Sequence, residues 1–571
     1  MIRSLTLAAV FLLLFTGAGT AASRHCPGSP VSSGFALDSL DARNPQVLDN
    51  LETLCRVWGY AKYHHPAFCD TVCIVDADRE LFALLPRIAR ADKAARNGAL
   101  LEWVRGLGNF TTDRAGYEEV LAPYACRTEA DLAWTADTAR LGSALCALLQ
   151  DLRYAERGAN RYIGCPSGLN AVMANETADG SLDDCGVRLL WLFRFWNVVE
   201  YYNPNRNASD RDWGEVLRVH LPAFIPPFSR GYPEICGLVR ELCDSHAAST
   251  QYAMFGMRTI PVEVRNACGR VFVTAGEALE KGDEILAVDG RDRARTHRSL
   301  ELYEAVSNDE NLDYMTARSM CSSFRDTAEV TVLRRGAELT LRVPTSDSAS
   351  EWSPYAPPRM RDEANVRLIA DSVGYVTGMN LAAIPAAEIM ERFRATKAIV
   401  VDMRCYPDGS MFIYDFVGRC LLPRTTHYVT WLVPSLALPG TYIEQPTDLF
   451  VDWEHLEKGE NPDYYKGRVI VLVDSSTQSM AEHAVMAFQA VPGCTVVGTQ
   501  TAGADGNVTQ LVMPGGQAMW WFSALGVYYP DGGDAQRAGV RIDIPVHPTV
   551  GGLQAGRDEI LERALALARH E

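Results

Sequence analysis

The sequence predicts a multidomain α+β protein with helical modules in its first half, a β module in the middle and an α/β domain at its end. Three observations support this. The chain has 571 residues, which is too many for one hydrophobic core. A helical pattern of apolar residues occurs twice in the first half. From Val373 onward, strand-like runs alternate with helical stretches, which is typical of parallel α/β sheets.

The helical modules form an internal repeat. Residues 54–58 (LCRVW) match residues 192–196 (LFRFW), and the tyrosine and proline that follow match at the same offset. Apolar and aromatic residues in both copies fall at helical spacing, so we expect two helical modules, over residues 23–165 and 166–254. By the same spacing, the tryptophan of each copy is expected to lie in the core.

Residues 255–346 are predicted to form the β module. Residues 279–290 resemble the helix-turn-strand signature of PDZ domains, and residues 328–336 indicate an edge strand followed by a turn. PDZ domains bind the C-terminus of a peptide by adding it to the sheet edge as a strand. The carboxylate-binding loop of such domains is not recognisable in this sequence. Two interpretations therefore stay open: capture of peptides, or a degenerate module that only packs beside its neighbours.

A candidate nucleophile lies in the C-terminal domain, residues 347–571. The apolar run 469–473 is predicted to be a buried parallel strand, and helical spacing begins near Met480. Ser479 therefore lies where a polar loop enters a helix. Nucleophilic serines favour such places, because unpaired N–H groups and the positive end of the helix dipole face the reacting centre. An ordinary helix cap would show the same pattern.

Two flanking segments favour the nucleophile. Residues 398–409 form a predicted strand that runs into a glycine turn, and residues 496–507 form another that runs into a glycine-rich loop. In this order and spacing they resemble the tail-specific, or C-terminal processing, serine peptidases and their relative, the tricorn core protease. The resemblance implies a spiral, crotonase-like core with Ser479 as nucleophile. It also implies an oxyanion hole made by the N–H groups of Gly409 and Met480.

The general base departs from the commoner pattern of that family. Most members carry a lysine in the glycine-rich loop, and this position is Ala504, which cannot take a proton. The tricorn branch uses a histidine next to a serine from an earlier part of the chain, and Ser245-His246 resembles that element. Histidine suits the task because its ordinary pKa lies near neutrality. The resemblance also calls for an orienting residue near the C-terminus. Its literal counterpart is Gln536, Asp534 could stand in for it, and that role stays open.

His483 is a local rival to His246 as the base. It lies four residues after Ser479, so on one helix the two would share a face. However, the loop before the helix is expected to hold Ser479 out of helical register. A base on the same helix would also face the core rather than an incoming peptide. We therefore predict that His246 is the base and that His483 is structural.

Composition limits the partners and the compartment. The formal net charge of −17 argues against nucleic acid or an anionic membrane as a partner. Residues 1–22 combine a short positive start, an apolar stretch too short to span a bilayer and a small-residue cleavage site. We therefore expect a secretory signal and a periplasmic or extracellular protein. No other stretch is long and apolar enough to be transmembrane.

The cysteines and histidines outside the candidate site are predicted to be structural. All 15 cysteines follow the signal, and in an oxidising compartment they favour several disulfides. No two cysteine pairs have zinc-finger spacing, so no metal or other cofactor is expected. His64-His65 is predicted to be a surface pair at a helix end.

Two functions from different classes fit these features. The first is a secreted serine endopeptidase that hydrolyses peptide bonds through an acyl-enzyme on Ser479, with His246 as base. A substrate could be engaged through its C-terminus by the PDZ-like module. The second is a catalytically silent scaffold that keeps both folds and holds peptides. The intact Ser479 and Ser245-His246 favour the enzyme, whereas the missing lysine and charged third member favour the scaffold. The sequence does not predict the oligomeric state.

Overall fold

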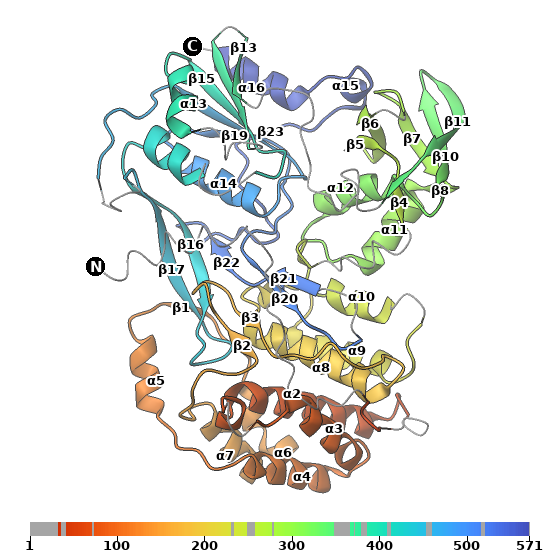
Figure 1. Cartoon of the computed structure of the whole chain (residues 1–571), viewed down its shortest axis with the longest axis vertical. Coiled ribbons are helices and arrows are strands. Elements are labelled where there is room, and N and C mark those ends of the chain that lie inside the picture. The colour runs from red at the N-terminus through yellow and green to blue at the C-terminus, as the bar shows by residue number, and fades with distance from the viewer. Residues whose placement is uncertain are drawn as a thin grey trace.

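The structure is a computed structural model that describes residues 32–35, 41–70, 74–229, 233–247, 257–276, 279–347, 366–370, 372–378, 385–407, 413–452, 459–515 and 520–569. These residues form a helical region, a small sheet region with two helices, and a parallel-sheet region (Figure 1). The predicted mixed, multidomain class is thereby confirmed. The predicted signal, residues 1–22, lies outside the described residues.

The helical region contains both copies of the repeat. Its helices are α2 (Pro45–His64), α3 (Ala77–Ile88), α4 (Lys93–Gly106), α5 (Arg114–Leu121), α6 (Thr138–Leu141), α7 (Ser143–Leu152), α8 (Cys185–Tyr202), α9 (Trp213–Phe224) and α10 (Pro233–Arg240). The indole of Trp58 in α2 donates to the carbonyl of Ala77 at 2.8 Å, and the indole of Trp196 in α8 donates to the carbonyl of Trp213 at 2.8 Å. Each long helix is therefore tied to the start of the next in the same way, through a buried tryptophan as predicted.

The two copies pack on each other and are not separate bodies. Helix α2 meets α8 at Gly59 and Asn197, which occupy equivalent places in the repeat. The amide of Asn197 donates to the carbonyl of Cys55 across the contact (3.1 Å) and to the carbonyl of Phe193 in its own helix (2.8 Å). Side chains of both copies form one hydrophobic core. The boundary expected after residue 165 therefore divides a single core.

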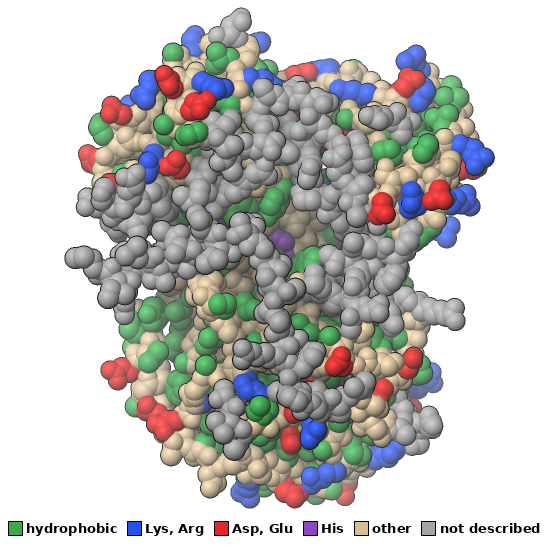
Figure 2. Space-filling model, viewed as in Figure 1, with side chains coloured by type: hydrophobic (Ala, Val, Ile, Leu, Met, Phe, Trp, Pro, Cys, Tyr) green, Lys and Arg blue, Asp and Glu red, His purple; other side chains and the backbone are tan. Residues whose placement is uncertain are grey.

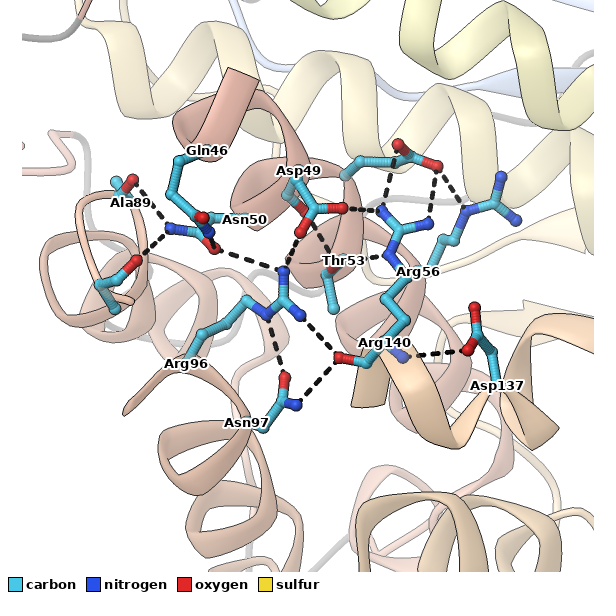
Figure 3. A network of polar contacts seen from close by, with 12 residues as sticks. Gln46, Asp49, Asn50, Thr53, Arg56, Ala89, Arg96, Asn97, Asp137 and Arg140 are labelled. Carbon is cyan, nitrogen blue, oxygen red and sulfur yellow. Dashed lines mark hydrogen bonds and ion pairs between the residues drawn. The ribbon is translucent and has the colours of Figure 1, made fainter. Parts of the chain in front are cut away.

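A buried polar network fixes the first copy (Figure 3). The guanidinium of Arg96 in α4 is fully buried and pairs with Asp49 of α2. It also donates to the carbonyl of Arg140 in α6 at 2.8 Å. The side chain of Arg140 pairs with Asp49 at 2.9 Å and with Glu52 at 3.1 Å. Because these charges compensate each other, the network joins three helices without leaving a buried charge unpaired.

The sheet region is an antiparallel sheet with two helices beside it. Its strand order is β11-β10-β7-β6-β5, with β8 paired to β7. The elements are β5 (Val262–Ala267), β6 (Arg270–Gly276), β7 (Glu284–Val288), β8 (Arg291–Asp292), α11 (Arg293–Tyr303), α12 (Asp309–Met320), β10 (Thr327–Arg334) and β11 (Ala337–Pro344), with a small sheet of β4 (Arg258–Thr259), β9 (Ser322–Ser323) and β12 (Ser346–Asp347). The prediction of an edge strand at 328–336 is wrong, because β10 pairs with β7 on one side and β11 on the other. Alternating burial fits either position in a sheet, so the pattern alone did not decide between them.

The C-terminal region contains a mostly parallel sheet of order β13-β14-β15-β18-β19-β23, in which β13 is antiparallel. Its elements are β13 (Val366–Ile369), β14 (Val373–Thr377), α13 (Ala386–Phe393), β15 (Ala398–Asp402), the π-helix η4 (Ile413–Leu421), β18 (Arg468–Val473), α14 (Met480–Gln489), β19 (Thr495–Gly498), β23 (Ile544–Pro545), α15 (Val550–Gln554) and α16 (Glu559–Arg569). Helices α13 and α14 pack on one face and α16 on the other. This explains the continuous apolar strands, since both faces of the sheet are buried.

Two smaller sheets join the C-terminal region to the helical region. The strand β1 (Cys126–Thr128) pairs with β17 (Tyr442–Leu449) in the order β1-β17-β16-β22, where β16 is Thr426–Pro434 and β22 is Gly526–Tyr528. The hairpin of β20 (Val508–Leu511) and β21 (Trp520–Ser523) lies between the helical region and the parallel sheet (Figure 1). Phe522 of this hairpin is fully buried in the helical core. The hairpin is therefore a C-terminal element that the helical region holds in place.

Two local predictions about cysteine and histidine are wrong. All cysteines among the described residues are free thiols, so the expected disulfides are not formed there. His64 and His65 are buried, not on the surface. The ring of His64 bonds to the carbonyl of Tyr60 (2.8 Å) and stands edge-on to Tyr201 of α8. The second copy covers this helix end, which the pattern of one helix could not show.

The surface charges and the helices bear on the expected partners. On the face shown in Figure 2, acidic and basic side chains of the described residues are mixed. Within the described part of the chain, no helix has the length and apolar character needed to cross a membrane.

The contact between α2 and α8 gives a stability prediction. In Gly59→Ala, the new Cβ would lie 2.0 Å from Cγ of Asn197, so this side chain must shift and its hydrogen bond to the carbonyl of Cys55 is disturbed. We expect the free energy of unfolding to fall by about 1–3 kcal/mol. The matched control is Gly98→Ala in α4, where a Cβ would meet nothing within 4 Å. That change should raise the free energy of unfolding by about 0.5–1 kcal/mol. Urea denaturation measures both, and equal effects would show that the contact is not tight.

Candidate active site

Ser479 is the last residue before α14, and the local backbone presents its side chain at the helix entrance. Strand β18 ends at Val473, a polar turn follows, and Ser479 has φ 58° and ψ −125°. A positive φ is strained for a residue with a Cβ, and such strain concentrates at functional sites. The Ser479 side chain is hydrogen-bonded to Tyr406. The prediction that the loop holds Ser479 out of helical register is confirmed by these angles.

The carboxylate of Glu482 holds the glycine-rich loop against the entrance of α14. It accepts hydrogen bonds from the Thr501 hydroxyl (2.5 Å) and from the N–H groups of Gly503 (2.8 Å) and Ala504 (3.0 Å). A longer contact of 3.3 Å comes from the N–H of Ser479, which also donates to the carbonyl of Ala504 at 2.9 Å. Burial raises the pKa of Glu482 to about 7, against the effect of these donors. One buried side chain thus fixes the backbone on both sides of the serine.

His246 lies in the turn that follows α10, at the edge of the helical region, and it is buried. Its Nδ1 is 2.8 Å from the hydroxyl of Ser523 at the end of β21. The Ser523 hydroxyl donates to Oδ1 of Asp244 at 3.0 Å, and the Ser523 N–H donates to Oδ2 at 2.7 Å. The N–H of His246 also donates to Asp244 at 3.0 Å. A carboxylate, a hydroxyl and the imidazole therefore form a continuous chain.

The direction of this chain fixes the histidine tautomer. A hydroxyl has one proton, and that of Ser523 is donated to Asp244. Ser523 must then accept from Nδ1–H of His246, which leaves the lone pair on Nε2. No hydrogen bond to Nε2 occurs among the described residues. Burial lowers the pKa of His246, and the negative charges of Asp244 and Asp505 oppose this. The neutral ring with a free Nε2 is the form that can accept a proton.

The loops that carry Ser479 and His246 are in direct contact. The side chain of Gln478, just before the serine, donates to the carbonyl of Ser245, just before the histidine, at 3.1 Å. The predicted role of Ser245 in the imidazole network differs from the structure. Its hydroxyl lies 3.0 Å from Oδ1 of Asn311 and accepts from the N–H of Ser307 at 2.9 Å. Ser245 thus anchors the loop of the base to the sheet region, and Ser523 holds the ring.

The start of α12 in the sheet region holds three active-site loops together. Asn308 donates to the carbonyls of Thr501 (2.9 Å) and Arg537 (3.0 Å). Asn311 contacts Ser245 in the turn that carries His246, residues 241–247, which is called the base loop. Arg265 of β5 forms an ion pair with Asp474. Asp474 is the first residue of the loop that leads to Ser479, residues 474–479, which is called the nucleophile loop. The sheet region therefore contacts the base loop, the nucleophile loop and the glycine-rich loop.

His483 is fully engaged elsewhere. Its Nδ1 is 3.0 Å from Asp505, its Nε2 is 2.9 Å from the hydroxyl of Tyr428, and its ring stacks on Trp431. The ring is buried, and it lines the same pocket as Ser479. With both nitrogens occupied, His483 has no free lone pair to offer Ser479.

The candidate orienting residues do not reach the imidazole. Asp534 is largely exposed, and its ion-pair partner is Arg127 at 3.9 Å. Gln536 has no hydrogen bond to His246 among the described residues, and its buried amide nitrogen lacks a partner there. The spacing from Gly539 was therefore a wrong guide, and the structure puts Asp244 in that position through Ser523. Asp244 could have been suspected because it adjoins Ser245-His246, but nothing in the local sequence marks Ser523.

The two predicted oxyanion donors are the N–H groups of Met480 and Gly409. Met480 is the first residue of α14, and its N–H has no acceptor within the helix. Gly409 lies outside the described residues, although the strand before it, β15, is present as predicted. Among the described residues, no group of three or more His, Cys, Asp or Glu side chains could hold a metal ion.

The raised pKa of Glu482 predicts how stability depends on pH. The native carboxyl, with a pKa of about 7, binds its proton more tightly than the unfolded chain, whose value is 4.5. Stability is then fully present below pH 4.5 and is lost as the pH rises towards 7, by about 2–3 kcal/mol. Glu482→Gln should remove this slope in urea denaturation between pH 4.5 and 7.5. The control is Glu388→Gln on the surface of α13, which should keep it. The same slope in both variants would assign it to another group.

Comparison with known proteins agrees with this geometry. Residues 385–546 match the profile of Peptidase family S41. No curated protein matches the chain. Mature CPAF complexed with lactacystin is a similar solved structure, with 14% identity and a TM-score of 0.51 over 67% of this chain and 98% of that chain. The photosystem II D1 C-terminal processing protease matches at 17% identity over 65% and 97%, but its TM-score of 0.36 is too low to carry an argument.

The CPAF structures share their fold with this chain, and the S41 match spans the strand β15, the nucleophile loop and the glycine-rich loop. These are the segments on which the sequence resemblance rests. Residues 385–546 therefore form a domain that matches Peptidase family S41, and the chain has the fold of the CPAF structures.

Proposed function

We propose that Ser479 attacks the scissile carbonyl of a peptide or protein substrate and that His246 is its general base. The observation that carries this proposal is the contact between the two loops, Gln478 to the carbonyl of Ser245 at 3.1 Å. It supports the proposal because it joins the loop of a strained serine to the loop of a histidine whose Nε2 has no hydrogen bond among the described residues. The catalytically silent scaffold, the second candidate, would need neither the strain nor the ordered imidazole.

The proton would travel through Nε2 of His246. The Ser479 hydroxyl turns from Tyr406 to Nε2, gives up its proton as its oxygen bonds to the carbonyl carbon, and leaves an imidazolium. Asp244 stabilises that positive charge through Ser523. The imidazolium then protonates the leaving amine, the C–N bond breaks, and an acyl-enzyme remains on Ser479. Water, deprotonated by the same nitrogen, hydrolyses the ester.

The negative oxygen of the intermediate would be stabilised at the start of α14. The N–H of Met480 and the positive end of the helix dipole lie beside Ser479. The second donor that we propose, the N–H of Gly409, rests on the family resemblance. The spiral, crotonase-like arrangement of the core rests on the same resemblance.

The remaining parts of the proposal concern substrate delivery and compartment. We propose that the sheet region is a PDZ-like module, because its two helices and antiparallel strands accompany a PDZ-like signature at 279–290. Binding of a substrate C-terminus there would follow from that assignment. Export to the periplasm or the exterior is proposed from residues 1–22 alone.

The nucleophile is tested with a fluorophosphonate, which labels an activated serine. The wild-type protein should be labelled, and Ser479→Ala should not, with peptidase activity lower by about four to six orders of magnitude. Folding should be nearly unchanged, because a cap hydroxyl contributes about 1 kcal/mol. A wild-type protein that stays unlabelled would favour the silent scaffold. Comparable turnover by Ser479→Ala would remove this serine from the mechanism.

The base is tested by comparing the two histidines. His246→Ala should abolish the burst of acylation with an activated ester, whereas His483→Ala should keep it and lose stability. Because burial lowers the pKa of His246 and only the neutral ring accepts a proton, kcat/KM should fall on the acid side with a midpoint below pH 6.5. A burst that survives in His246→Ala alone would reverse the assignment. A midpoint near pH 9 would exclude a histidine base.

The chain of Asp244, Ser523 and His246 is tested by removing its middle member. In Ser523→Ala, Nδ1 loses its acceptor and the tautomer is no longer fixed, so kcat should fall by roughly 10²–10³-fold with little change in KM. Ser523→Thr keeps the hydroxyl and should recover most of the activity. Ser322→Ala, another buried serine, is the matched control and should remain active. If Ser523→Ala and Asp244→Asn have independent, additive effects, the chain does not act as a unit.

A further inference from the structure

A cavity of about 330 Å³ opens beside Ser479. Its size lies within the range of about 300–1,000 Å³ that holds small organic ligands, so a large side chain fits. Its walls are mainly apolar, with contributions from Met480, Trp431, Leu525, Leu169 and Val172. No mechanism described so far uses this space.

Two polar side chains of the cavity wall are already paired, whereas the buried amide nitrogen of a third, Asn507, has no partner among the described residues. Asp505 accepts from Nδ1 of His483 (3.0 Å) and from the N–H of Gly506 (2.6 Å), and it is buried. Asn170 donates to the carbonyl of Val508 at 3.3 Å. A charged side chain entering the cavity would lose water, and Asp505, the acidic group of the wall, is already paired with His483, so its entry is unfavourable. An apolar side chain would gain by leaving water.

The position of the cavity indicates which substrate residue enters it. Ser479 and Met480 line the cavity, and His246 does not. The general base must reach the leaving amine, so the side near His246 belongs to the leaving group. Because His246 does not line the cavity, the cavity is assigned to the residue that forms the acyl-enzyme.

One wall comes from the helical region and not from the peptidase domain. Residues 166–172 connect β2 (Ile163–Gly164) with β3 (Val172–Met173), and Leu169 packs into the core of the C-terminal region. Val172 is half-buried beside the strand β20. The size of the cavity therefore depends on a segment more than 200 residues before Ser479.

We propose that this cavity selects a large apolar residue, such as leucine, methionine or phenylalanine, on the acyl side of the scissile bond, and that the segment 166–172 sets this preference. The proposal rests on the acylation of Ser479 proposed above. The helical region thus supplies both the base and one wall of the specificity pocket.

The test compares fluorogenic peptides that differ only at this residue. The wild-type protein should show kcat/KM about 10–100-fold higher for Phe or Leu than for Ala, Asp or Arg. Val172→Glu places a carboxylate on the wall and should reverse the order of Arg and Leu. Val219→Glu is the control, because Val219 is an exposed valine on α9 away from the cavity, and it should keep the wild-type order. If Val172→Glu does not fold, Val172→Ala, which widens the cavity, should raise the ratio of Trp to Leu.

The outcomes separate this proposal from the proposed function. The assignment of the cavity would be overturned if kcat/KM were equal for all side chains. It would also be overturned if the Val172 variants changed kcat/KM by the same factor for every peptide. In both cases labelling of Ser479 by fluorophosphonate would still support the proposed function. If fluorophosphonate does not label the wild-type protein, the proposed acylation of Ser479 is wrong. The cavity is then tested by itself, by calorimetric titration of Ser479→Ala with peptides. Peptides that end in Phe should then bind at least tenfold more tightly than peptides that end in Ala. Equal affinities would overturn the proposal.

Discussion

The geometry of the site depends on the contact in which Asp244 and Ser523 hold His246. Asp244 and His246 come from the turn after α10, whereas Ser523 ends the strand β21 of the C-terminal region. The same hairpin buries Phe522 in the helical core. The histidine is therefore ordered only when the two regions are docked. Under the proposal that His246 is the base, activity is a property of the assembled chain rather than of the peptidase domain alone.

The sheet region reinforces this docking at the start of α12. Asn308 and Asn311 contact the glycine-rich loop and the base loop, and Arg265 pairs with Asp474 in the nucleophile loop. Each of these loops has few apolar side chains of its own to bury. Polar contacts with a neighbouring helix replace that missing core, and they are directional, so they fix position as well as proximity. Any event that moves α12 would move three parts of the site together.

The sequence predicted what local patterns encode. The strand β18 before the nucleophile, Ser479 at a helix entrance and the repeat around Trp58 all follow from apolar spacing within short windows. The contact between Ser523 and His246 was not predicted, because it joins residues 277 positions apart in the sequence and has no local signature. The predictions of a surface position for His64 and of an edge position for β10 were wrong for the same reason. In each case the neighbour that decides the environment comes from another part of the chain.

The residue at position 504 bears on the proposal that a distant histidine is the base. Its side chain is fully buried, its N–H is bound to Glu482 and its carbonyl accepts from Ser479. An alanine side chain cannot take a proton, so residue 504 cannot act as the base. Because residue 504 supplies no base, the glycine-rich loop contributes to the site only through its backbone, which supports Ser479. In the proposed mechanism the proton acceptor comes from outside the domain, from the turn after α10.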